Sequence, residues 1–174
     1  MTLKVCRFVA FLFVALVLGA GLAHLFAMPS KMALSSSAYL TVQQIYSGWG
    51  LVTVAVVGAV VSLGVLAWQL RRRRPRALVL TLAALGAVVA DEAVVWSYAH
   101  AAERVTGNWT VLPDDWLTLR AQWEYAHAAG AALDLVAFAA LALSVLIAER
   151  PVRYRGPDES SGGRGAPLRF MAVR

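Results

Sequence analysis

The residues best suited to chemistry are histidines and carboxylates that lie inside long apolar stretches of the sequence. An ionisable side chain costs about 2.5 to 3.5 kcal/mol to place at the centre of a membrane-spanning helix, so each one needs a partner or a function. We consider acid–base catalysis, metal binding and structural pairing as roles for these residues. They are His24, Asp91, Glu92, Glu124, His127 and Asp134, with His100 near the end of one stretch.

Glu124 and His127 form a Glu-x-x-His spacing that places both side chains on one face of a helix. Metal-binding helical bundles use the same spacing to supply two ligands. Other helices offer further polar groups, so we expect a shared polar centre with the metal ligands His24, Glu92, Glu124 and His127. Such a mixed set suits iron, copper, manganese or zinc, and the residue types do not select among them. A haem held by the two histidines is a further variant.

The elements that position these residues are four apolar segments. The chain has 174 residues, of which 60% are hydrophobic, and this is too apolar for a domain with a water-exposed surface. We predict spans over residues 5–28, 49–70, 77–99 and 123–148. The predicted fold class is therefore all-α, a four-helix transmembrane bundle over residues 1–150, followed by a disordered basic tail over residues 151–174.

Two boundaries within this fold are predicted from helix signals. Pro29 and Ser30 are expected to end the first helix. A helix capped by the serines at 35–37 is expected to begin with amphipathic turns over residues 39–47. Because consecutive spans run in opposite directions, we expect His24, Glu92, Glu124 and His127 to reach one common level near the outer membrane face.

The basic residues predict the orientation. Of the 16 lysines and arginines, all but Lys31, Arg104 and Arg120 fall on the inner side when both termini are placed inside. We therefore predict a multi-pass protein of the plasma membrane, namely a bacterial inner membrane, with both termini on the inner side. A cleaved signal peptide at the N-terminus is an alternative that would leave the same topology for the rest. The net charge of +6 is explained by topology and anionic lipid, so no nucleic-acid partner is expected.

Structural roles compete with catalytic ones. Glu124 could be an ion-pair partner of Arg120 one turn earlier, and His24 could bond another helix. Asp134 could pair with a serine or threonine, and Asp91 could face a neighbouring subunit of a homo-oligomer. The single cysteine excludes thiol–disulfide chemistry within the chain. Interface anchoring is predicted for five aromatic residues: Tyr39, Trp49, Trp109, Trp116 and Trp123. Trp96 is predicted to lie deeper, where it could line a pocket.

Four short stretches resemble a family of small four-helix membrane proteins that includes the anthrone oxygenases. They are Ala23–Leu25, Met28–Lys31, Tyr39–Tyr46 and Leu119–His127. The resemblance implies a four-helix fold with a polar centre near one membrane face and an oxygenase that converts anthrone-like aromatic compounds to quinones. The resemblance also implies functional roles for six residues of the matching stretches: His24, Gln43, Arg120, Trp123, Glu124 and His127.

Two hypotheses for the function follow. The first is a membrane oxidoreductase, oxygenase-like, that acts on a hydrophobic aromatic substrate entering from the bilayer. Its catalytic residues would be Gln43, Glu92, Arg120 and Glu124, with Glu92 or Glu124 as the base and the histidines as metal ligands or oxyanion donors. The second is a non-enzymatic membrane subunit or small-molecule-binding scaffold whose buried charges are structural.

Overall fold

The protein is a bundle of long helices in the computed structural model, which describes residues 2–72 and 74–148. Four helical segments are long and apolar enough to cross a membrane, and they cover Leu3–Met32, Ser36–Leu70, Pro75–Val105 and Trp116–Ile147. This confirms the predicted all-α four-helix bundle. The predicted tail over residues 151–174 lies outside the described residues.

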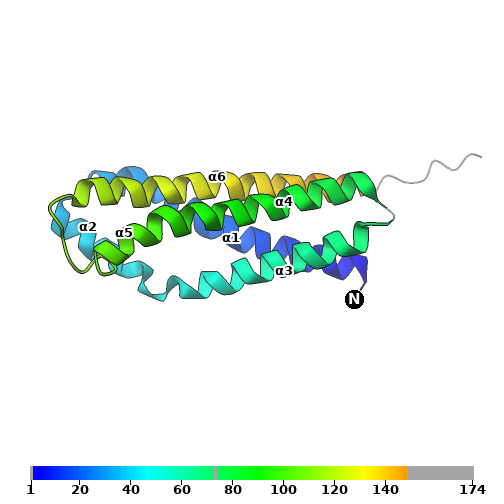
Figure 1. The fold of residues 1–174 in the computed structure, drawn as a ribbon, viewed down its shortest axis with the longest axis horizontal. Coiled ribbons are helices and arrows are strands. Elements are labelled where there is room, and N and C mark those ends of the chain that lie inside the picture. Colours follow the sequence, from blue (N-terminus) through cyan, green and yellow to red (C-terminus); the bar gives the residue numbers. More distant parts are fainter. Residues whose placement is uncertain (1, 73, 149–174) are drawn as a thin grey trace, which may run out of the picture.

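The first and last helices are the longest elements of the bundle. Helix α1 (Leu3–Met32) and helix α6 (Trp116–Ala148) lie along each other for much of their length. Helix α4 (Pro75–Val94) packs most extensively against α6, and α3 (Val52–Leu70) packs between α1 and α4. Figure 1 shows these four helices running nearly parallel to one long axis.

The prediction that the first helix ends at Pro29 is wrong, because α1 continues through this proline to Met32. A proline inside a helix removes one backbone hydrogen bond and crowds the preceding turn. Pro29 lies in the last turn of α1, where few backbone hydrogen bonds of the helix remain to be disrupted. The extra turn carries Lys31, whose side chain is buried in the bundle.

The second and third spans are not regular helices. The second consists of α2 (Ser36–Gln43), a 3₁₀ helix η1 (Gln44–Leu51) and then α3. The third consists of α4, a π-helical turn η2 (Val95–Ala99) and α5 (His100–Val105). Long 3₁₀ stretches and π-turns are uncommon, and both often mark functional positions. The third span therefore extends past its predicted end at residue 99.

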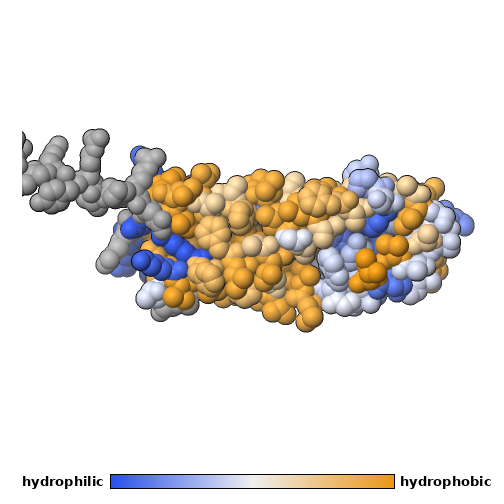
Figure 2. All heavy atoms as spheres, turned by 180° about the vertical axis from the view of Figure 1, so that it is seen from behind, coloured by the Kyte–Doolittle hydropathy of each residue, from blue (hydrophilic) through white to orange (hydrophobic). Residues whose placement is uncertain are grey.

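The surface divides into an apolar middle and polar ends. Figure 2 shows a broad hydrophobic belt across the middle of one face of the bundle, with hydrophilic residues towards both ends of this face. Large aliphatic side chains such as Val57, Leu82 and Leu143 are exposed on this surface. In a bilayer these side chains meet lipid rather than water, so the belt agrees with an integral membrane protein.

Three of the predicted interface anchors instead lie inside the bundle. Tyr39, Trp109 and Trp123 are almost completely buried in a second apolar cluster at one end of the molecule. Trp96, which we expected at a deeper position, is 65% exposed. Amphipathic aromatic rings suit an interface, but here the polar groups of Tyr39 and Trp123 bond other side chains, and this makes their burial favourable.

Candidate functional site

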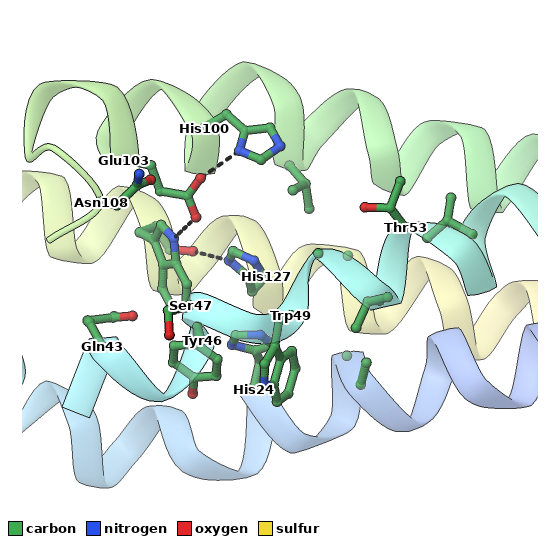
Figure 3. A pocket seen from close by; sticks show the side chains of 18 of the residues that line it. His24, Gln43, Tyr46, Ser47, Trp49, Thr53, His100, Glu103, Asn108 and His127 are labelled. Atoms are coloured by element: carbon green, nitrogen blue, oxygen red, sulfur yellow. Dashed lines mark hydrogen bonds and ion pairs between the residues drawn. The ribbon is translucent and has the colours of Figure 1, made fainter.

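A cavity of about 520 Å³ lies at the end of the bundle that holds α2 and α5. Its size is within the range of small-molecule pockets, about 300 to 1,000 Å³. All three histidines of the chain line it, with Figure 3 showing their rings. None of its lining residues is a lysine or an arginine. Acidic and aromatic residues also line it: Asp91, Glu92, Glu103, Asp134, Tyr46, Trp49, Trp109 and Trp123.

The centre of the lining is a stack of aromatic rings. The imidazoles of His24 on α1 and His127 on α6 are stacked, with centroids 4.4 Å apart and an interplanar angle of 28°. Tyr46 stacks with His24 at 4.4 Å and 23°, and Trp49 and Trp123 approach the same imidazole edge-on. These rings come from α1, η1 and α6, so the stack joins three elements. The arrangement offers flat apolar surfaces beside imidazole nitrogens.

The tautomer of His127 follows from its hydrogen bond. Its Nδ1 lies 2.9 Å from the backbone oxygen of Trp123. A carbonyl oxygen can only accept, so Nδ1 must carry the proton. In the neutral ring, Nε2 is then left as a lone pair able to take a proton. His24 differs, because its buried Nδ1 has no hydrogen-bond partner among the described residues.

A second polar chain runs along the wall formed by α5. Glu103 bonds His100 Nδ1 at 2.6 Å through one carboxylate oxygen, and it accepts a hydrogen bond from Trp123 Nε1 at 3.2 Å through the other. Figure 3 shows the Glu103 carboxylate directed towards the His100 ring. Because Trp123 also packs against His127 at 4.1 Å, Glu103 helps to hold the indole that supports the imidazole stack.

Beyond the cavity, a buried ion pair connects α1 to α6. Lys31 Nζ lies 2.7 Å from Glu124 Oε2, and both side chains are almost fully buried. The other carboxylate oxygen of Glu124 accepts a hydrogen bond from the Tyr39 hydroxyl at 3.0 Å, and Gln43 in turn donates to that hydroxyl. The Lys31 ammonium also lies 4.7 Å from the centroid of the Trp123 ring. Glu124 is thus held by partners from α1 and α2.

Arg120 lies beside this ion pair and does not line the cavity. Its guanidinium donates to the backbone oxygen of Leu34 at 3.0 Å and packs over the Trp116 ring at 4.7 Å. The connection between α1 and α2 contains Leu34, so Arg120 fastens this connection to α6.

The loop between α5 and α6 brings another aromatic residue to the cavity. Gly107, Asn108 and Trp109 have φ angles of 55°, 55° and 61°. Left-handed backbone costs about 1 to 2 kcal/mol per residue for residues with a side chain. The turn directs Trp109 inward, where its ring meets Tyr39 edge-on at 5.0 Å. Its carbonyl accepts a hydrogen bond from Gln44 at 3.1 Å.

The predicted site residues fall into two groups. His24, Gln43, Glu92 and His127 line the one cavity, whereas Glu124 and Arg120 lie in the neighbouring cluster. Across residues 2–72 and 74–148, no group of three or more histidine, cysteine or acidic side chains is arranged to hold a metal ion. The predicted metal ligands and catalytic roles stay predictions.

No family model, curated protein or solved structure matches the chain. The resemblance to the family that includes the anthrone oxygenases therefore stays a prediction.

Sequence reasoning missed Lys31, Glu103 and the proximity of Asp91 to Asp134. Lys31 follows His24 by seven residues, a spacing that places both on one helical face, but the expected helix end at Pro29 hid this signal. Glu103 follows His100 by three residues and could have been found in the same way. The two aspartates lie on different helices, so no local spacing relates them.

Proposed function

We propose that the cavity binds a flat, hydrophobic aromatic molecule that reaches it from the bilayer of the plasma membrane, and that the protein oxidises this molecule as an oxygenase. The observation that carries the proposal is His127, an imidazole with a free Nε2 in a cavity walled by aromatic rings. Flat rings suit the stack formed by His24 and Tyr46. The resemblance to the anthrone oxygenase family supplies the reaction class.

The reaction needs a base and dioxygen. His127 Nε2 takes a proton from an acidic CH₂ group of the substrate, such as the one between the two aromatic rings of an anthrone. The carbanion transfers its electron pair to O₂ and, with a proton, gives a carbon-bound hydroperoxide. Loss of the second C–H proton and of hydroxide, which leave together as water, gives a carbonyl. The balance is CH₂ + O₂ → C=O + H₂O, with carbon oxidised by four electrons.

The aromatic side chains and the amide of Gln43 would orient the substrate. Gln43 lies on α2 at the cavity wall, and its amide can donate to a substrate oxygen when it is not bonded to Tyr39. Glu124, by contrast, is bonded to Lys31 and Tyr39, so its role in this proposal is to hold the wall of the cavity.

The test uses the full chain in lipid nanodiscs with 1,8-dihydroxyanthrone as the probe. We expect O₂ uptake and quinone formation above the rate of empty nanodiscs. His127→Phe should keep the ring stack and lower the enzymatic rate by about 100-fold or more, the usual contribution of a general base. Tyr125→Phe changes an exposed ring two residues away and should leave the rate unchanged. A wild-type rate equal to that of empty nanodiscs would refute the oxygenase proposal.

Elemental analysis of the purified protein separates the cofactor-free reaction from a metal-dependent one. We expect little metal in the wild type, because the acidic residue predicted to share a site with His127, Glu124, is bonded to Lys31. A stoichiometric metal that is lost in both His24→Ala and His127→Ala would instead establish the ligand set predicted from the sequence.

A non-enzymatic subunit is the second candidate, favoured by the complete set of structural partners around Glu124. It predicts that a chain carrying Glu124→Gln and His127→Asn keeps its biological function as well as its fold. An enzyme with these two changes should remain folded and become inactive. Complementation of a deletion strain, read beside helicity in detergent, distinguishes the two outcomes.

A further inference from the structure

The inner end of the cavity is formed by two carboxyl groups, Asp91 on α4 and Asp134 on α6. Each packs against a glycine. A Cβ on Gly130 would collide with Oδ1 of Asp91, and a Cβ on Gly21 would lie 3.0 Å from Oδ2 of Asp134. The helices therefore leave room for both carboxyl groups between their backbones.

The two carboxyl groups interact directly with each other. Two carboxylates that lie close together and away from water repel each other when both are charged, and a proton shared between them relieves this repulsion. Glu92, on the helix of Asp91, is the third acidic group that faces the pair. Among the residues lining the cavity there is no lysine or arginine to neutralise these groups. A pair with one proton can both donate and accept a hydrogen bond.

Four buried polar atoms of residues that line this cavity have no hydrogen-bond partner among the described residues, and Oε1 of Gln43 and Nε1 of Trp109 are two of them. The other two belong to titratable side chains. They are Oδ1 of Asp134, whose residue is 2% exposed, and Nδ1 of His24, whose residue is 6% exposed. An unpaired buried polar atom costs about 1 to 3 kcal/mol, so such atoms in a cavity indicate a ligand that completes their bonding. The ligand should carry polar atoms towards both residues.

The distance between the histidine end and the aspartate end of the cavity sets the length of that ligand. Asp134 follows His127 by seven residues of α6, which is about 10 Å along the helix axis. A molecule of three fused rings in a line has a comparable length. Between the ends, Gly130 and Ala131 of α6 belong to the lining of the cavity, and the space beside Gly130 is taken by the Asp91 carboxyl group.

We propose that Asp91 and Asp134 form a second binding station, which holds a hydroxyl or carbonyl oxygen at the far end of the aromatic ligand. The cavity would then select aromatic molecules that carry oxygen at both ends. This inference rests on the proposed function only in that both need an aromatic ligand in the cavity, and it does not depend on the oxidation step.

The test compares two stable probes that differ by one terminal hydroxyl, 2,6-dihydroxyanthraquinone and 2-hydroxyanthraquinone. Binding to the full chain in nanodiscs is followed by quenching of the tryptophans that line the cavity, with empty nanodiscs as the reference for partitioning into lipid. We expect the wild type to bind the dihydroxy probe about fivefold more tightly, the gain from one additional hydrogen bond. A wild type that binds both probes equally would overturn the inference.

Two variants locate the source of this preference. Asp134→Leu should remove the fivefold difference by lowering affinity for the dihydroxy probe alone. Gly130→Ala should do the same without changing a charge, because its methyl group displaces the carboxyl of Asp91. This variant also keeps the test valid if Asp134→Leu does not fold. Retention of the preference in either folded variant would contradict the proposal.

Matched controls separate local from general effects. Gly86→Ala on α4 adds a methyl where nothing lies within 4 Å, and Ser144→Ala removes a buried hydroxyl contact to Thr81, another polar contact between α4 and α6. Both should keep the fivefold preference. If the wild type binds neither probe, the aromatic pocket of the proposed function fails. If it binds both with the preference but oxidises no anthrone, only the oxidation step fails.

Discussion

The imidazole rings of His24 and His127 lie face to face, although they come from the first and last helices of the bundle. Their centroids are 4.4 Å apart, and the Tyr46 ring and the Trp123 indole pack against the His24 imidazole. The contact therefore links the packing of α1 on α6 directly to the candidate site.

Substitution of His24 should separate the packing role of its ring from its polar role. His24→Phe keeps a ring between Tyr46 and His127, and we expect the free energy of unfolding to change by less than about 1 kcal/mol. His24→Ala removes the ring and should lower this free energy by about 2 to 4 kcal/mol. Denaturant titration in detergent, followed by circular dichroism, measures both. Equal effects of the two variants would show that the ring stack does not contribute to stability.

The ion pair of Lys31 and Glu124 should be sensitive to the loss of one partner. Lys31→Met leaves the buried Glu124 carboxylate without its cation, and we expect a loss of about 3 to 5 kcal/mol in the free energy of unfolding. The double variant with Glu124→Gln should recover part of that loss, because no unpaired charge remains. The same denaturant titration checks this. A double variant less stable than Lys31→Met would contradict the explanation.

Two glycines on α3 make a matched test of the packing between α1 and α3. A Cβ on Gly58 would overlap the ring of Phe13, whereas a Cβ on Gly64 would meet nothing within 4 Å. Gly58→Ala should therefore destabilise the protein by about 1 to 3 kcal/mol. Gly64→Ala should be neutral or stabilising by up to about 1 kcal/mol, because alanine favours the helix. Thermal unfolding in one detergent compares the pair, and a stable Gly58→Ala chain would disprove the close contact.

The predicted orientation can be tested by cysteine labelling in intact cells. Cys6 is buried, so it should give little background with a membrane-impermeant maleimide. Asp114→Cys, in the loop before α6, should be labelled from outside, whereas Arg72→Cys should be labelled only after the cells are lysed. The reverse pattern would place the cavity at the cytoplasmic face and would invert the predicted topology.

The number of spans, their order and the positions of the ionisable residues along them could be read from the sequence. This is because a run of about 20 apolar residues has essentially one stable arrangement in a bilayer, a helix that satisfies its own backbone hydrogen bonds. Spacing within one helix was equally informative. Glu124 and His127 lie about one helical turn apart on α6, although each faces a different group of partners.

Contacts between helices were decided only by the tertiary structure. Whether Glu124 meets Arg120 or Lys31, and whether Asp91 meets a neighbouring subunit or Asp134, depends on the rotation of each helix about its axis. The rotation of each helix is set by side-chain packing against its neighbours. The sequence alone is compatible with many alternative contacts between helix faces of similar hydrophobicity. These rotations also depend on the continuation of α1 past Pro29 and on the irregular turns η1 and η2. We did not predict these three features from the sequence.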